Sequence, residues 1–173
     1  MKNVLLVLLL ACAVTTLNAQ DNRQQKVIDQ LAAIHLMIER SPIDSVKVRY
    51  AKMIRETGLP SAELDLPDGR YRGESPADDF DYQHVVEFEV QAGKIVRLDY
   101  DEVHQDGRGK EGDEAYCKKM SITGTTPAIA YPVYEKALLE TNKLDELDAV
   151  SGASFSLYRF KLSVAYALVN GTL

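Results

Sequence analysis

Residues 84–100 read HVVEFEVQAGKIVRLDY. Apolar side chains alternate with charged or amide side chains along both halves of this stretch, which is the pattern of a β-strand with one buried face. Ala92 and Gly93 interrupt the alternation, and this pair favours a tight turn. The stretch therefore predicts an antiparallel β-hairpin. The side chains predicted to face the core are Val86, Phe88, Val90, Val96, Leu98 and Tyr100.

Two helical patterns precede the hairpin. Between residues 22 and 40, apolar residues recur at helical spacing. In the second pattern we expect Ser41 to cap a helix, with Pro42 at its first position, and the pattern stops at Gly58. We expect this helical pair either to pack on the rest of the chain or to contact a partner. Its predicted inward residues are Val27, Leu31, Ile34, Ile38, Val46, Tyr50, Met53 and Ile54.

Two further helical patterns follow the hairpin. Pro132 is expected in the first turn of a helix that stops at Asn142. From Phe155 to Val169, apolar residues form two stripes, which predicts a helix buried over much of its circumference. Together with the hairpin, these patterns predict an α+β fold. An antiparallel sheet packs with helices and is preceded by the N-terminal helical pair.

The first 19 residues have the pattern of a secretory signal, with an apolar run between a lysine and Ala19. Cys12 follows Leu-Leu-Ala, which resembles a lipoprotein cleavage box, so lipidation is the alternative to cleavage after Ala19. We expect an extracytoplasmic protein, periplasmic or secreted. The rest divides into the helical pair (20–60) and a second domain (61–173). No later segment approaches the ~20 apolar residues of a membrane span.

Charge and spacing exclude several classes of function. The chain has 20 Lys and Arg residues against 26 Asp and Glu, which argues against nucleic-acid binding and against adsorption to anionic membranes. The polar residues 101–114 predict a solvated loop and lack the order of a calcium-binding loop. The three histidines and Cys117 show no zinc-ligand spacing, so we expect no metal site. No catalytic residue set is predicted, because the serine motif described below lacks the flanks of a nucleophile elbow.

The sequence DAVSGAS, residues 148–154, places Ser151 and Gly152 in a turn just ahead of the apolar C-terminal segment. Free amides at the start of a helix form a ready site for an anion such as phosphate. Ser154 adds a hydroxyl where that anion would lie. The same residue types are also common as simple helix caps, so the motif alone leaves capping and anion binding open.

This motif resembles the flavinylation motif of the FMN-binding domain family, Asp-x-x-Ser/Thr-Gly-Ala-Thr, with Ser154 in place of the last Thr. The family includes the flavin subunits of sodium-pumping NADH:quinone reductases and flavin lipoproteins of the pheromone-precursor type. The opening strand of the family, Asp-Gly-x-Tyr-x-Gly, is matched by residues 68–73, and its Gly-Lys-Ile turn by residues 93–95. The pheromone-precursor branch carries Asp-Gly-x-x-Lys and Asp-x-x-Tyr-x-x-x-Met, matched by residues 106–110 and 113–120.

The resemblance implies an exported protein that carries FMN, joined to Ser154 through a phosphoester bond by a separate flavin transferase. Ser151 and the amides of Gly152 and Ala153 would hold the phosphate, and the transferase would recognise Asp148. The other residues implied at the cofactor are Lys110, Tyr116 and Met120, whose alternative is an ordinary loop or core role.

The implied function is electron transfer to a redox partner protein or a membrane electron-transport complex, because the flavin supplies the chemistry. A second hypothesis keeps the fold and holds FMN non-covalently, or holds none and serves as an interaction module. The serine at position 154 motivates this alternative.

Overall fold

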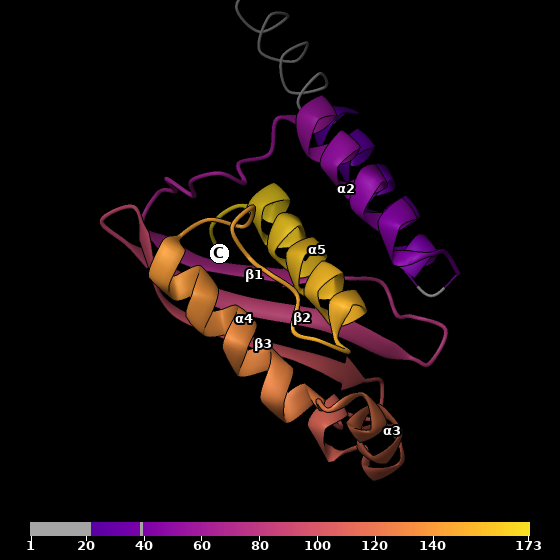
Figure 1. The fold of residues 1–173 in the computed structure, drawn as a ribbon. Coiled ribbons are helices and arrows are strands. Elements are labelled where there is room, and N and C mark those ends of the chain that lie inside the picture. Colours follow the sequence, from indigo (N-terminus) through magenta and orange to yellow (C-terminus); the bar gives the residue numbers. More distant parts are fainter. Residues whose placement is uncertain (1–21, 39) are drawn as a thin grey trace, which may run out of the picture.

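The computed structural model describes residues 22–38 and 40–173 (Figure 1). The expected signal segment, including Cys12, lies outside these residues. The described chain has the predicted α+β fold, with helical residues before a three-stranded antiparallel sheet and further helices after it. The sheet consists of β1 (Gly69–Glu74), β2 (Tyr82–Gln91) and β3 (Lys94–His104), in that spatial order.

The predicted hairpin is confirmed. β2 pairs antiparallel with β3, and both turn residues have positive φ angles, 51° at Ala92 and 74° at Gly93. The inward position predicted for Val96 is wrong, because its side chain is 49% exposed and its neighbour Ile95 is buried. A bulge shifts the register after Glu89 and moves Val96 to the outer face.

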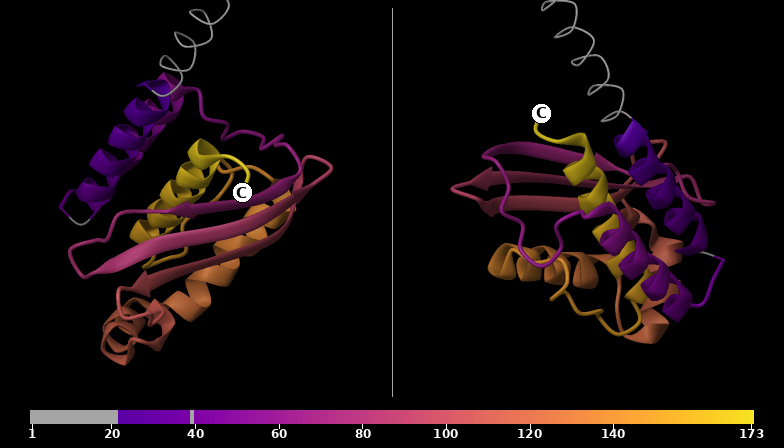
Figure 2. Two further views of the ribbon diagram at one scale, coloured as in Figure 1. Left: turned by 180° about the vertical axis from the view of Figure 1, so that it is seen from behind. Right: turned by 90° about the horizontal axis from the view of Figure 1, so that it is seen from above.

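Two long helices cover one face of the sheet, α4 (Pro127–Thr141) and α5 (Ser154–Asn170) (Figure 1). Seen from behind, the opposite face carries no helix of the described chain (Figure 2). α4 begins earlier than predicted, since Pro127 rather than Pro132 occupies its first turn. The main core lies between sheet and helices. Its largest members include Tyr71, Phe88, Tyr100, Tyr131, Tyr134 and Phe160.

Gly73 fixes how closely the sheet meets α5. A Cβ atom at this position would overlap the carbonyl oxygen of Ser163 and would lie 2.5 Å from the amide nitrogen of Ala167. The backbones of β1 and α5 are therefore in direct contact, which only glycine permits. The last glycine of the predicted opening strand thus has a packing role.

The helical pair packs on the side of α5 turned away from α4. It consists of residues 22–38 and α2 (Ile43–Thr57). Its buried residues form a second core with Leu162, Ala165 and Tyr166 of α5. The predicted cap at Ser41 is wrong, since Pro42 occupies the cap position and forms no side-chain cap bond. Because α5 belongs to both cores, it ties the pair to the sheet.

The segment predicted as a loop over 101–114 is more ordered than expected. β3 continues to His104, a short 3-10 helix, η1, spans Lys110–Gly112, and α3 spans Glu114–Met120. Another 3-10 turn, η2 (Ser121–Thr123), follows directly. These short elements close one end of the sheet next to the start of α5 (Figure 1).

Candidate functional site

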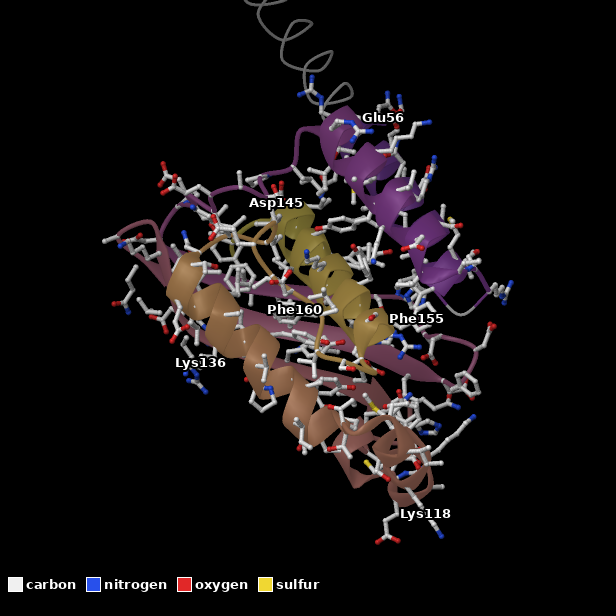
Figure 3. The ribbon with its side chains drawn as sticks, viewed as in Figure 1. Glu56, Lys118, Lys136, Asp145, Phe155 and Phe160 are labelled. Atoms are coloured by element: carbon white, nitrogen blue, oxygen red, sulfur yellow. The ribbon has the colours of Figure 1, made fainter. Side chains whose placement is uncertain are left out.

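A cavity of about 270 Å³ opens where the segment before β2, the η1–α3 region and the first turn of α5 meet. Phe155 lies at the end of α5 closest to α3 (Figure 3). The aromatic and apolar walls come from Phe80, Tyr82, Tyr116, Met120 and Phe155. Three cationic residues, Lys110, Lys119 and Arg159, also line it. Flat apolar walls with a few cations suit a planar anionic ligand.

The cavity brings together five of the eight residues predicted at the cofactor. Lys110, Tyr116 and Met120 meet Gly152 and Ala153 of the motif there. The other three do not line it. Ser154 is the half-buried first residue of α5, whereas Ser151 and Asp148 are exposed.

The motif forms a tight turn immediately before α5. Gly152 has a φ of 80°, and a Cβ atom there would lie 2.6 Å from Cβ of Thr123. The amide of Ala153 donates to the carbonyl of Val150 at 2.9 Å, so this amide, expected at the phosphate, is already used within the turn. Among the described residues, no acceptor is found for the amides of residues 154–156, the first turn of α5. The amide of Gly152 also has no acceptor among these residues, so one of the two predicted donors is available and residues 154–156 add three more.

Tyr134 of α4 holds this turn in place through two hydrogen bonds. Its buried hydroxyl donates to the carbonyl oxygen of Ala153 at 2.8 Å and accepts from the amide of Val150 at 3.3 Å. The turn is therefore held at both ends by one side chain from a neighbouring helix. The sequence contained no local pattern that linked Tyr134 to the motif.

Lys110 lies among aromatic rings. Its Nζ is 3.6 Å from the ring centroid of Tyr82 and 4.4 Å from that of Tyr116, and the residue is 2% exposed. Asp113 holds the Tyr82 ring, because it accepts a 3.0 Å hydrogen bond from the Tyr82 hydroxyl, and it also caps α3 at the backbone amide of Tyr116. Burial and this bond raise the pKa of Tyr82 to about 12. The tyrosine remains neutral, and its ring attracts the ammonium group.

Glu102 lies behind the cavity and is fully buried. Its Oε2 atom is 3.5 Å from Nζ of Lys110 and 3.5 Å from Nη1 of Arg159. Burial raises the pKa of Glu102 to about 7, and it lowers the pKa of Arg159 to about 10. One carboxyl group thus positions two of the cations that line the cavity.

Two histidines extend this polar cluster toward the helical pair. The ring centroids of His35 and His84 are 5.2 Å apart, and their four buried ring nitrogens have no hydrogen-bond partner within the part of the chain that the structure describes. The nearest carboxylates to His84 are Asp78, at 3.9 Å, and Glu102, at 3.8 Å. Within the described part of the chain, no group of His, Cys, Asp and Glu residues is placed to hold a metal ion.

Comparison with known proteins gives the family. No protein-family model matches the sequence. Over 100 residues the chain is 33% identical to the 15 kDa lipoprotein of Treponema pallidum, a match that covers 56% of this chain and 70% of that protein. The chain belongs to the family of this lipoprotein.

A solved structure also resembles this member of the lipoprotein family. The crystal structure of the CPE2226 protein from Clostridium perfringens has a TM-score of 0.54 and 34% sequence identity, and the match covers 59% of this chain and 86% of that one. A lipoprotein relative is consistent with the expected export signal and an extracytoplasmic location. Across residues 22–38 and 40–173, none of the helices has the length and apolarity needed to span a membrane.

Proposed function

We propose that this protein binds FMN in the cavity at the start of α5 and acts as an extracytoplasmic electron carrier. One observation carries the proposal. Residues from two separate parts of the sequence, 110–120 and 152–153, were expected at the same cofactor, and they line a single cavity. When bound, FMN would supply electron-transfer chemistry, and the protein would supply its surroundings.

The residues present fit the chemical groups of FMN. The rings of Tyr82, Tyr116 and Phe155 and the thioether of Met120 would contact a flat ring system. The unpaired amides of residues 154–156 would donate to the phosphate, which the positive end of α5 also favours. Lys110 and Arg159, both fixed by Glu102, would favour the negatively charged form of a ligand ring.

The finer part of the proposal is a covalent bond at Ser154. Its hydroxyl oxygen would attack the flavin phosphate of a flavin dinucleotide on the transferase. A phosphoester would form as the nucleoside monophosphate leaves, and the hydroxyl proton would pass to a base of that enzyme. The exposed Asp148 and Ser151 would be accessible for recognition by the transferase.

Coexpression with a flavin transferase tests the attachment. The purified protein would be denatured, run on a gel and viewed under ultraviolet light. We expect a fluorescent band for the wild type, no band for Ser154→Ala, and a retained band for Ser156→Ala, the matched control two residues further along α5. Equal bands for the two variants would contradict attachment at Ser154.

Non-covalent binding is the second candidate, and one observation favours it. Ser154 is half-buried and does not line the cavity, although its neighbours on both sides do. In that case FMN would colour the native protein and would be lost completely on denaturation. A protein that stays colourless after incubation with FMN would instead indicate the flavin-free interaction module.

A further inference from the structure

Charged residues are distributed unevenly between the helical pair and the rest of the chain. Residues 22–58, which contain the helical pair, have seven Lys and Arg residues against four Asp and Glu. Residues 59–173 have 12 Lys and Arg against 21 Asp and Glu. The acidic average of the whole chain therefore conceals a basic region.

Cations of the helical pair gather at one end of the molecule. Arg23 and Lys26, near the start of the first helix, and Arg55, in the last turn of α2, line a shared groove of about 740 Å³. Within the described chain, none of the three forms an ion pair. Of the described residues that line the groove, Glu56 alone is acidic, and its Oε1 atom lies 3.5 Å from Nζ of Lys52. The groove is thus a positively charged surface, because three cations line it beside a single carboxylate that already pairs with Lys52.

The position of the groove indicates what it faces. Arg23 lies eleven residues after Cys12, the site of the lipid in the lipoprotein alternative, and eleven residues span at most about 40 Å. A protein anchored there keeps this end near the bilayer. Glu56 borders the groove, whereas Lys118, on α3 beside the cavity, lies at the opposite end of the molecule (Figure 3).

We propose that Arg23, Lys26 and Arg55 form a docking surface for the anionic headgroups of a phospholipid bilayer. The groove is mostly polar, so contact would be electrostatic and reversible, without insertion. Docking would orient the protein with the cavity directed away from the membrane. This inference rests on the charges and on the distance along the chain to Cys12, and it does not depend on FMN.

Vesicle sedimentation tests the docking surface. The unlipidated chain from Gln20 would be mixed with vesicles containing phosphatidylglycerol, or with phosphatidylcholine vesicles. We expect binding to the anionic vesicles only, and loss of that binding as salt screens the charges. Each cation near the surface contributes about fivefold, so Arg23→Gln/Lys26→Gln/Arg55→Gln should weaken binding roughly a hundredfold.

The control removes the same charge elsewhere. Lys94→Gln/Arg97→Gln/Lys136→Gln changes three exposed cations of the hairpin and α4, and it should keep nearly full binding. Circular dichroism would confirm that both variants fold. No binding to anionic vesicles at low salt would overturn the proposal. Equal losses in the two variants would also overturn it, as would saturable displacement by glycerol phosphate, which would indicate a site for a free anion.

Discussion

The hydroxyl of Tyr134 donates a 2.8 Å hydrogen bond to the carbonyl oxygen of Ala153, the residue that immediately precedes α5. It also accepts a 3.3 Å bond from the amide of Val150. A helix that packs on the sheet thereby fixes the turn on which the proposed cofactor site depends. The rigidity of the site comes from a residue that does not line the cavity.

Tyr134→Phe should therefore loosen the turn while the ring remains packed. Loss of the two bonds should lower the free energy of unfolding by about 1–2 kcal/mol, measured by urea denaturation. Tyr166→Phe is the matched control, because that buried hydroxyl has no hydrogen-bond partner among residues 22–38 and 40–173 and its removal should cost little. Equal destabilisation of the two variants would show that the Tyr134 bonds contribute nothing specific.

Gly152→Ala should disturb the same turn more severely. The positive φ disfavours any side chain, and the added Cβ would meet Thr123. We expect a loss of about 1–3 kcal/mol in unfolding free energy and weaker FMN binding in a fluorescence titration. Gly124→Ala, also at positive φ but with open space around it, separates strain from collision. The collision account fails if both variants lose the same stability.

Glu102→Gln should change how stability depends on pH. The pKa of Glu102 is raised to about 7 in the folded protein, so the wild type loses stability as pH rises from about 4.5 through 7 and the buried carboxyl becomes charged. The difference from the variant, on the order of 3 kcal/mol at pH 8 relative to pH 4.5, would be measured by denaturation across this range. A constant difference at all pH values would contradict the raised pKa.

The histidine pair should act in the opposite sense. Burial lowers the pKa of both His35 and His84 below 6.5, so the unfolded chain takes up protons first. Stability should be fully present above pH 6.5 and fall below it, by up to about 1.4 kcal/mol per pH unit for each histidine. His84→Phe should reduce this acid sensitivity by about half. Identical slopes below pH 6.5 would disprove the contribution of His84.

Local patterns in the sequence were enough to predict the hairpin and the buried C-terminal helix. Alternation and helical spacing are properties of neighbouring residues, so they do not require tertiary contacts. The bulge that exposes Val96 and the start of α4 at Pro127 depend on how the elements pack. For that reason the pattern alone misplaced them.

The buried charges were missed because the segment after residue 100 is polar and was expected to lie in solvent. Leu98, Tyr100 and Glu102 nevertheless share one face of β3, as the two-residue period requires. The same period places His84 inward with Val86 and Phe88. Continuing the alternation past the apolar residues would have found both groups. Their convergence with Lys110 and Arg159 required the fold.

The central proposal is that FMN becomes bound at the start of α5, and intact mass spectrometry of transferase-treated protein tests it most directly. We expect a mass increased by one FMN less one water, with the modified peptide containing Ser154. An unmodified mass, together with no flavin absorbance in the native protein after incubation with FMN, would contradict it.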